Sequence, residues 1–286
     1  MNDDPSVLDP GLYLIATPIG TARDITLRAL DLLKSADVLV AEDTRSLRRL
    51  MDIHGIDFSG RPVLSYHDHN GPKIRPQILS RIQAGQSVLY ASEAGSPMVA
   101  DPGFDLARDV IATGLPLVCA PGPSAVVAAL CLSGLPTDRF LFGGFLPTTQ
   151  SRRKTALAEL ADIPATLIFY ESPRRIAGFL QDAIDVLGGT RQAALCREMT
   201  KKFEETLRGT LQDVSAQIED RQIKGELVVL IDRGAKRSAT TEDIREALSH
   251  ALESMSVRDA AENVAQAFNL KKRDVYQQAL ALVKKE

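Results

Sequence analysis

The chain has 286 residues, of which 44% are hydrophobic and 25% charged, and its formal net charge is -3. Its length allows two or three domains, its composition is that of a globular protein, and its weak negative charge excludes a polycation that binds nucleic acid through bulk electrostatics. No apolar run approaches the ~20 residues of a membrane span, and the N-terminal segment MNDDPSVLDP is polar, so we expect a cytoplasmic protein with no membrane partner.

The first part of the chain alternates short apolar runs with amphipathic segments. The apolar runs predict strands and are LYLIA (12–16), DVLVA (37–41), SVLYAS (87–92) and LPLVCA (115–120). We expect helices from Ile25, capped by Asp24, at 44–54 and around Ala107. Strands joined through helices lie parallel, and continuous apolar runs fit strands covered on both faces. Residues 1–121 are therefore predicted to form an α/β domain.

A second α/β unit is predicted at residues 122–234. The segment GLPTDRFLFGGFLPTTQ (134–150) interrupts the alternation with glycine and proline, and we place the domain boundary near 121–135. The predicted elements that follow are strands in ATLIFYE (165–171), QAALCRE (192–198) and GELVVLID (225–232), and helices at 173–187 and 211–218. FEETLRGT (203–210) indicates an antiparallel hairpin, so this sheet should be mixed.

The tail, residues 240–286, follows a polar linker at 233–240 and carries three amphipathic helical patterns. Thr241 and Ser256 are placed to cap the first two helices, and a turn at NLKK (269–272) begins the third. Short helices joined by a tight turn resemble a helix-turn-helix module that binds nucleic acid. A packing or dimerisation element fits the same pattern equally well.

The cysteines and the basic clusters have plain structural interpretations. Cys119, Cys131 and Cys196 lie far apart in apolar surroundings without a Cys-x-x-Cys motif, so we expect buried thiols rather than disulfides or thiolate metal sites. Each short basic cluster is more typical of a solvated helix face than of a nucleic-acid site. These clusters are Arg45 with Arg48 and Arg49; Arg152 to Lys154; Arg174 with Arg175; and Lys271 to Arg273.

Three turns stand out: TPIG (17–20), SEAGSP (92–97) and APGPSA (120–125). Each follows a predicted strand of the first domain, and ligands of parallel α/β sheets bind at the carboxyl ends of the strands. Their glycine, proline and small hydroxyl residues leave the backbone open to close approach. Together the three turns predict a cradle for a small ligand.

The character of that ligand follows from charge and hydrogen-bond donors. Gly20 stands alone, without a P-loop or a dinucleotide fingerprint. Glu42 and Asp43 occupy the place of a ribose-binding acid and would permit NAD, but the prolines of the turns remove donors that a pyrophosphate needs. Glu93 and Asp101 flank the middle turn. A neutral or positively charged ligand therefore suits the cradle better.

Two other kinds of site are disfavoured. GPSAV (122–126) begins like a nucleophile elbow but lacks the second glycine, so a serine hydrolase is not indicated. HDHN (67–70) places two imidazoles on one side of an extended segment, but the sequence offers no third metal ligand. We expect a polar rim or an ordinary loop there, and no metal.

Several blocks together resemble one family. They are YLIATPIGTARDITLRAL, AEDTR, SYHDHN, SEAGSPMVADPG, PGPSA, GLPTDRFLFGGFLP, FYESPRR and KGELVVLI. Their order and spacing resemble the ribosomal RNA small subunit methyltransferase I family, a branch of the tetrapyrrole methylase superfamily. The resemblance covers residues 11–232, and the tail is similar to the helix-turn-helix segment of many members. No single block would be specific, but the whole set in register is.

The resemblance implies two α/β domains of tetrapyrrole methylase type with a cofactor cleft between them, plus a small C-terminal helix-turn-helix-like module. The implied cofactor is S-adenosylmethionine, whose positive sulfonium suits the acidic surroundings of the turns. The cofactor-binding residues that it implies are Thr17, Pro18, Glu93, Ala94, Gly95, Ser96, Ser124, Ala125, Phe169, Tyr170, Arg197, Gly225, Glu226 and Leu227.

The family methylates the ribose 2'-hydroxyl of a cytidine in the decoding region of small-subunit (16S) ribosomal RNA. Alignment in a closed cleft should supply most of the acceleration, and the hydroxyl needs a hydrogen-bond acceptor, for which Glu42 and His67 are the catalytic candidates. The substrate-binding candidates are Asp43, Arg45, Glu171, Arg174 and Arg175, with Arg45 and Arg174 as phosphate clamps. Asp43 could equally serve only to cap the following helix.

The resemblance further implies 16S ribosomal RNA or the 30S subunit as partner, and a homodimer. The chain departs from the usual pattern at Thr21, where asparagine is common, in SEAGSP, where aspartate and threonine are usual, and in ESPRR, where histidine is common. These departures affect geometry more than activity. Two alternatives remain: a methyltransferase of the same superfamily acting on a tetrapyrrole, and a non-catalytic RNA-binding protein.

Overall fold

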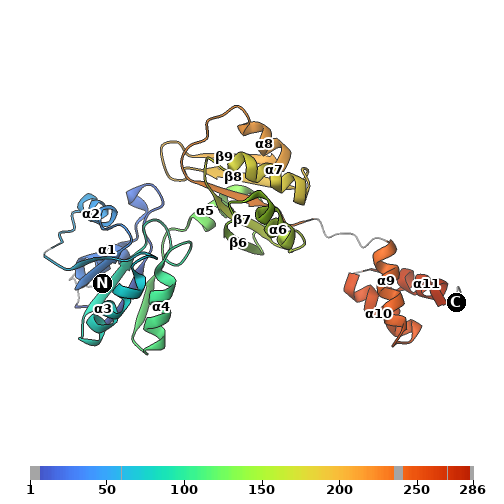
Figure 1. The fold of residues 1–286 in the computed structure, drawn as a ribbon, viewed down its shortest axis with the longest axis horizontal. Coiled ribbons are helices and arrows are strands. Elements are labelled where there is room, and N and C mark those ends of the chain that lie inside the picture. Colours follow the sequence, from blue (N-terminus) through green and yellow to red (C-terminus); the bar gives the residue numbers. More distant parts are fainter. Residues whose placement is uncertain (1–6, 59, 235–240, 269, 284–286) are drawn as a thin grey trace. The chain divides into compact units, whose positions relative to one another are not determined.

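The computed structural model describes residues 7–58, 60–234, 241–268 and 270–283 (Figure 1). The described chain forms two compact units: one runs up to Ala158 and includes Ala165–Asp232, and the other comprises Glu159–Pro164 and the residues from Arg233 onward. Most of the predicted linker and the first residue of the NLKK turn lie outside the described residues. Among the described helices, none is long and apolar enough to cross a membrane.

The first sheet is parallel throughout, with strand order β3-β2-β4-β1-β5. Its strands are β1 (Gly11–Ile15), β2 (Val38–Ala41), β3 (Val63–Ser65), β4 (Ser87–Ala91) and β5 (Leu117–Ala120). Its helices are α1 (Leu27–Ser35), α2 (Thr44–Ile53), α3 (Gly71–Gln83) and α4 (Gly103–Ala112). Successive β1 side chains enter two different core clusters, because alternate residues of a strand point to opposite faces. Both faces of the sheet are therefore covered, as the apolar runs predicted.

The predicted start of the first helix is wrong. Residues Ala22–Asp24 form a short 3-10 turn, and Thr26 caps α1 by accepting a hydrogen bond from the Ala29 amide at 3.1 Å. Because the turn shifts the helix by two residues, Leu27 is exposed and Leu32 and Leu33 pack in the core. The short strand β3 and the helix α3 were also not predicted.

The second sheet is mixed, which confirms the prediction. Its order is β6-β7-β10-β8-β9, with β6 and β7 parallel and the remaining pairs antiparallel. The strands are β6 (Phe140–Phe145), β7 (Thr166–Glu171), β8 (Gln192–Arg197), β9 (Glu205–Thr210) and β10 (Leu227–Ile231). The associated helices are α5 (Ala125–Ser133), α6 (Gln150–Leu160), α7 (Ile176–Leu187) and α8 (Leu211–Ile218). Helix α5 covers one face through Ala129, which packs with Ile168 and Val228.

The cysteine prediction holds for one residue only. Cys196 is buried in β8, and burial raises the pKa of its thiol. Cys119 and Cys131 are exposed. Cys119 lies on β5, which is the edge strand of the first sheet, and Cys131 lies in α5 between the buried Leu130 and Ser133 on its outward side. Apolar neighbours in sequence do not by themselves bury a side chain on an edge strand or a one-sided helix.

The described residues of the tail form three helices, α9 (Thr241–Leu252), α10 (Val257–Phe268) and α11 (Lys272–Val283). They share a small core that includes Leu248, Val264 and Val275. The Ser256 hydroxyl accepts a hydrogen bond from the Asp259 amide at 3.3 Å, so Ser256 caps α10 as predicted. The three amphipathic patterns in the sequence of the tail are consistent with this shared core, because each helix turns its apolar face inward.

The basic cluster at Arg152 to Lys154 is not a uniformly solvated face, because Arg153 is buried. Its Nε lies 2.7 Å and its Nη2 2.6 Å from Oδ2 of Asp182, a fully buried residue of α7. Gln150 donates a further hydrogen bond of 2.9 Å to the same carboxylate. This pair joins α6 to α7. Removing one member leaves the other charge buried and unpaired, which costs far more than losing a surface ion pair.

We expect Asp182→Asn to lower the free energy of unfolding by about 3–5 kcal/mol, because the Arg153 guanidinium would lose its counter-charge while staying buried. Urea unfolding followed by circular dichroism measures this change. Lys154→Ala is the matched control, since Lys154 makes partly exposed ion pairs in the same cluster, and it should hardly move the midpoint. Equal effects of the two substitutions would contradict the conclusion that the buried Arg153–Asp182 pair stabilises the fold more than the exposed ion pairs of Lys154.

Candidate functional site

The three turns predicted to form a cradle lie together at the carboxyl edge of the first sheet. The backbones of Thr17 and Gly95 exchange two hydrogen bonds, each 3.0 Å long. The Ser96 hydroxyl donates to the Pro123 carbonyl at 2.9 Å. The first turn is therefore bonded to the second, and the second to the third, which confirms that they adjoin.

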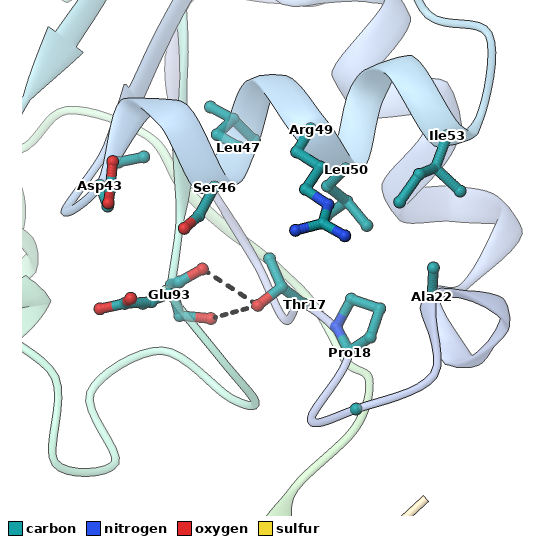
Figure 2. Close-up of a pocket in the computed structure, with 13 residues that line it drawn as sticks. Thr17, Pro18, Ala22, Asp43, Ser46, Leu47, Arg49, Leu50, Ile53 and Glu93 are labelled. Carbon is teal, nitrogen blue, oxygen red and sulfur yellow. Dashed lines mark hydrogen bonds between the residues drawn. The ribbon is translucent and has the colours of Figure 1, made fainter. Parts of the chain in front are cut away.

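Buried hydroxyl groups support these turns from beneath. The Thr17 hydroxyl donates to the Ser92 carbonyl at 3.0 Å (Figure 2). The Ser92 hydroxyl in turn donates to the Gly95 carbonyl. Gly95 has a φ of 79°, a left-handed conformation that favours glycine. Because the Thr17 hydroxyl is already bonded within the fold, it holds the turns in place and is not directed toward a ligand.

A cavity of about 930 Å³ opens beside the turns and is lined by residues of both sheets and their loops. From the first domain these are Pro18, Ile19, Gly20, Glu42, Ser46, Arg49, Glu93, Ala94, Val99, Ala100 and Asp101. From the second they are Ala125, Phe145, Tyr170, Glu171, Ser172, Pro173, Met199, Lys201, Gly225, Glu226, Leu227 and Val228. A volume of this size is at the upper end of the ~300–1,000 Å³ typical of cofactor and ligand sites.

Many of the predicted site residues line this cavity. They are Pro18, Glu42, Glu93, Ala94, Ala125, Tyr170, Glu171, Gly225, Glu226 and Leu227. The others predicted for the cofactor, Thr17, Gly95, Ser96, Ser124, Phe169 and Arg197, do not line it. Thr17, Gly95 and Ser96 instead form the layer that bonds the turns together.

Phe169 is placed on the wrong face of β7 to reach the cavity. Its ring is fully buried and lies 5.5 Å from that of Phe179, centroid to centroid. The next residue, Tyr170, faces the cavity side and contacts the ring of Phe145 at 5.6 Å. Because neighbouring residues of a strand point to opposite faces, only one of the two side chains can line a site there.

Arg197 supports the cavity wall from outside. Its Nε donates to the Lys224 carbonyl at 2.7 Å, and its Nη1 lies 3.5 Å from the Glu205 carboxylate. Lys224 directly precedes Gly225, which lines the cavity. Arg197 therefore positions the start of β10 and does not extend into the cavity.

The second wall of the cavity includes a strained loop after β8. Glu198 and Thr200 have φ values of 49° and 63°, which are uncommon for residues with a side chain. Glu198 accepts a hydrogen bond from the Glu226 amide, and this bond lowers the pKa of its carboxyl. Lys201 joins the carboxylates of Glu198 and Glu226 at 3.1 and 2.9 Å. These bonds hold the strained loop against β10, and such strain is frequent at functional sites.

The single glycine of the first turn is explained by this loop. A Cβ on Gly20 would lie 2.9 Å from the Met199 carbonyl oxygen and 2.7 Å from Cγ of Lys201. The adjacent Thr21 amide donates to the Thr200 hydroxyl at 3.1 Å. Gly20 is needed because the loop after β8 packs directly on the turn.

The first-domain wall is acidic, and its charges act on Glu42. Burial raises the pKa of the Glu42 carboxyl, and the nearby charges of Glu93, Asp101 and Asp68 raise it further. His67 opposes this rise in pKa. A cationic ligand would relieve the repulsion among these carboxylates. Glu42 itself is suited to accept a proton or a hydrogen bond.

Asp101 also organises the loop that follows the second turn. Its Oδ1 accepts hydrogen bonds from the Tyr90 hydroxyl and the Gly103 amide, both at 2.8 Å, and from the Met98 amide at 3.2 Å. Met98 and Ala100 have φ values of 68° and 54°. This carboxylate therefore holds a second strained loop against the cavity, and the sequence pattern did not reveal that role.

Two of the predicted substrate residues are engaged with each other. Asp43 accepts a hydrogen bond from the Arg45 amide at 2.8 Å and caps α2, and its carboxylate lies 3.1 Å from the Arg45 guanidinium. The hydrogen bond from the Arg45 side chain lowers the pKa of Asp43. The structure therefore shows the capping role for Asp43, one of the two alternatives. Neither Asp43 nor Arg45 lines the large cavity.

His67 also does not line the large cavity. Its ring lies 6.0 Å from that of His69, and its Nδ1 is buried without a hydrogen-bond partner among the described residues. The described residues contain no cluster of three or more metal-ligating side chains. His67 affects the cavity through its electrostatic influence on Glu42.

Arg174 and Arg175 differ in their surroundings. The Arg175 Nη2 lies 3.2 Å from the buried Glu171 carboxylate and donates to the Leu146 carbonyl at 2.7 Å. Arg174 is exposed, and no ion pair joins it to another described residue. Arg175 therefore holds Glu171 at the cavity wall, and Arg174 is the one of the two that is open to a partner.

Sequence comparisons identify two family models in the chain. Residues 11–215 match the model for Tetrapyrrole (Corrin/Porphyrin) Methylases, and residues 238–283 match the RsmI C-terminal HTH domain. Proteins named Ribosomal RNA small subunit methyltransferase I are similar over most of their length. That of Mesorhizobium japonicum is 44% identical and covers 96% of this chain and 93% of its own. That of Xylella fastidiosa is 42% identical and covers 80% and 84%.

Solved structures share the fold. The methyltransferase CobJ aligns with a TM-score of 0.60 at 18% identity and covers 79% of this chain and 95% of its own. A diphthine synthase aligns with a TM-score of 0.58 at 16% identity and covers 77% and 90%. Together with the two sheets and the helical tail, these matches confirm the predicted fold class.

We expect Gly20→Ala to lower the free energy of unfolding by about 1–3 kcal/mol, because the added methyl group would push the turn and the strained loop apart. Chemical unfolding monitored by intrinsic tyrosine fluorescence measures the change. Gly178→Ala in α7 is the control: its Cβ would lie 3.6 Å from the nearest atom, an ordinary contact, and alanine favours a helix by about 0.5–1 kcal/mol. A Gly20→Ala protein as stable as the wild type would contradict this packing.

Proposed function

Because the chain belongs to the ribosomal RNA small subunit methyltransferase I family of the tetrapyrrole methylases, we propose that it methylates the ribose 2'-hydroxyl of a cytidine in 16S ribosomal RNA. The enzyme is a methyltransferase that uses S-adenosylmethionine. The observation that supports the site best is the acidic cavity of about 930 Å³ at the bonded turns. We propose further that the 30S subunit in the cytoplasm is the substrate and that the enzyme acts as a homodimer.

The cavity suits this cofactor. Its backbone turns lie open, Glu42, Glu93 and Asp101 give it an acidic wall, and Tyr170 with Phe145 supplies aromatic surface for an adenine ring. S-Adenosylmethionine carries an activated methyl group on a positively charged sulfur. We propose that Pro18, Ala94 and Ala125, one from each of the three turns, contact the cofactor, and that Gly225 to Leu227 at the start of β10 contact it through their backbone.

Glu42 is our candidate for the group that accepts the proton of the ribose hydroxyl. It lines the cavity, and burial and neighbouring acids raise its pKa above the ordinary glutamate value. A base works best when its pKa is near the working pH. His67 remains a weaker proposal, because it acts on Glu42 without lining the cavity. Alignment and exclusion of water by the two walls supply the rest of the acceleration.

RNA binding is assigned to local surfaces because the net charge is negative. Arg174 lies exposed next to the cavity residue Pro173, and it can contact a backbone phosphate without breaking an internal ion pair. The helical tail, which matches a helix-turn-helix model, is proposed as a second contact with RNA. Arg45 is a weaker phosphate-clamp candidate because it is already paired with Asp43.

Transfer of tritiated methyl groups tests the proposed function. The purified protein should label 30S subunits or 16S RNA, and nuclease digestion should yield one 2'-O-methylated cytidine. Labelling of a porphyrinoid acceptor but not of RNA would favour the tetrapyrrole alternative. Tight binding of S-adenosylmethionine with no transfer to any acceptor would favour a non-catalytic protein.

The pH dependence of the rate tests Glu42. As the acceptor, its carboxylate must be ionised, so kcat should fall as the pH falls through its raised pKa, above the usual glutamate range. Glu93→Gln removes a charge that raises this pKa, so the acidic limb should move to lower pH. Glu42→Gln should lower kcat by about 10²–10⁴-fold and abolish the limb.

Rates for this test are measured at saturating cofactor, because Glu93 also contributes to cofactor binding. Calorimetry with S-adenosylmethionine serves as the control for folding and binding of each variant. An acidic limb that is unchanged in Glu42→Gln would remove Glu42 from the mechanism.

A further inference from the structure

A second, smaller cavity of about 190 Å³ adjoins the first. Figure 2 shows the residues that line the smaller cavity. The two cavities share Pro18, Gly20, Ser46, Arg49 and Glu93. Helix α2 forms one wall of the small cavity, and the ends of β1 and β4 form its base through Thr17 and Ser92. The proposed function assigns no ligand to this small cavity.

Two hydrogen-bond donors on α2 line both cavities. Ser46 and Arg49 are three positions apart, which places them on one face of the helix. Figure 2 shows the Arg49 guanidinium extending toward Thr17 and Pro18. Among the described residues, neither the Ser46 hydroxyl nor the Arg49 guanidinium has a hydrogen bond or an ion pair. Both donors are therefore free to bind a ligand.

The other arginines of α2 are engaged elsewhere. Arg45 pairs with Asp43, and the Arg48 guanidinium lies 5.0 Å from the centroid of the Phe58 ring. Arg49 is thus the member of this basic cluster that has no partner among the residues that the structure describes. Its position also differs, because it extends into the cavities, where the other two do not.

The carboxylates near Arg49 do not neutralise it. Asp43 is paired with Arg45, and Figure 2 shows the Glu93 carboxylate pointing away from Thr17 and Arg49. A guanidinium with a neighbouring hydroxyl matches the oxygens of a phosphate group, and arginine and serine are common donors to nucleic-acid backbones. The small cavity therefore offers a cationic place beside an otherwise acidic site.

We propose that Arg49 and Ser46 bind a backbone phosphate of the RNA strand next to the ribose that is methylated. This inference rests on the proposed function, which places the ribose hydroxyl near Glu42. Glu42 and Ser46 line the same large cavity and are four positions apart in sequence. Since the 3'-phosphate is attached through oxygen to the ring carbon adjacent to the one that carries the 2'-hydroxyl, the clamp has to lie beside the hydrogen-bond acceptor, where Arg49 lies.

The carboxylate of S-adenosylmethionine is another anion of similar chemistry. The experiment therefore measures RNA binding and cofactor binding separately, in Arg49→Ala, Arg49→Lys and Ser46→Ala. Arg48→Ala is the matched control, because it removes the same side chain from the same helix outside both cavities. RNA binding is measured with a 16S fragment at several salt concentrations, and cofactor binding by calorimetry.

In Arg49→Ala the dissociation constant for RNA should rise about tenfold, and the slope of log K against log salt should become shallower by about 0.7–0.9. The affinity for S-adenosylmethionine should stay within about twofold, which is below 0.5 kcal/mol. Arg49→Lys should recover part of the RNA affinity, because it keeps the charge but not the fork of donors. Ser46→Ala should have a smaller effect of the same kind, and Arg48→Ala none.

Weakened cofactor binding with unchanged RNA binding in Arg49→Ala would overturn the proposal and assign the small cavity to the cofactor carboxylate. Equal losses in Arg48→Ala and Arg49→Ala would also overturn it. Because RNA binding is measured without methyl transfer, failure of the phosphate clamp can be distinguished from failure of the proposed function. A wild-type protein that binds RNA through Arg49 but transfers no methyl group would support the clamp and contradict the proposed function.

Discussion

The site depends on the pair of backbone hydrogen bonds between Thr17 and Gly95. These bonds connect the ends of β1 and β4, two neighbouring strands whose turns would otherwise be separate loops. The Thr17 and Ser92 hydroxyls reinforce the connection from within the core. Ligand-binding turns built from glycine and proline have few side chains to hold them. Their backbone groups must therefore be held by one another, and this is what leaves an ordered but open surface for a ligand.

The same constraint extends to the second sheet. Gly20 lies so close to Met199 and Lys201 that only glycine fits, and Thr21 bonds to Thr200. The loop that meets them carries left-handed residues held by Glu198 and Glu226. Each wall of the large cavity is thus a strained loop fixed by carboxylates: Asp101 on one side and Glu198 on the other. Strain of this kind persists only where neighbouring bonds over-determine the conformation, as they do here.

The parts of the fold that could be predicted from sequence are those with local causes. Apolar runs predicted β1, β2, β4, β7 and β10. The location of the ligand-binding turns follows from the rule that ligands of parallel sheets bind at the carboxyl ends of the strands. The missed elements had weak local patterns. β3 has three residues and no buried position, and α3 contains Pro76, which argues against a helix. Capping of α1 by Thr26 was missed because aspartate is also a good capping residue and Asp24 directly precedes the predicted start at Ile25.

Of the site, sequence and family resemblance could indicate which turns matter but not which way side chains point. The resemblance implied which residues bind the cofactor but not the direction of their side chains, and Phe169 and Tyr170 lie on opposite faces of one strand. Arg175 and Arg174 look alike in sequence, but within the described part of the chain only Arg175 is joined to a buried carboxylate. The same limit hid Arg49, which in the sequence is one of three similar arginines. Long-range pairing, which distinguishes such residues, leaves no local signal in the chain.

The charges of the site show why one acidic cavity can serve both a cationic cofactor and an anionic strand. Glu42, Glu93 and Asp101 line the large cavity, and the charges of Glu93 and Asp101 raise the pKa of Glu42, so a positive ligand is stabilised there. A phosphate would be repelled by the same wall unless a cation lay at its border. Arg49 lies at that border, on the second turn of α2, which begins two residues after Glu42. Helix α2 therefore separates the two requirements. The acidic end of β2, which precedes the helix, suits the cofactor and the ribose hydroxyl. The basic side chain of Arg49, on the helix itself, suits the RNA backbone.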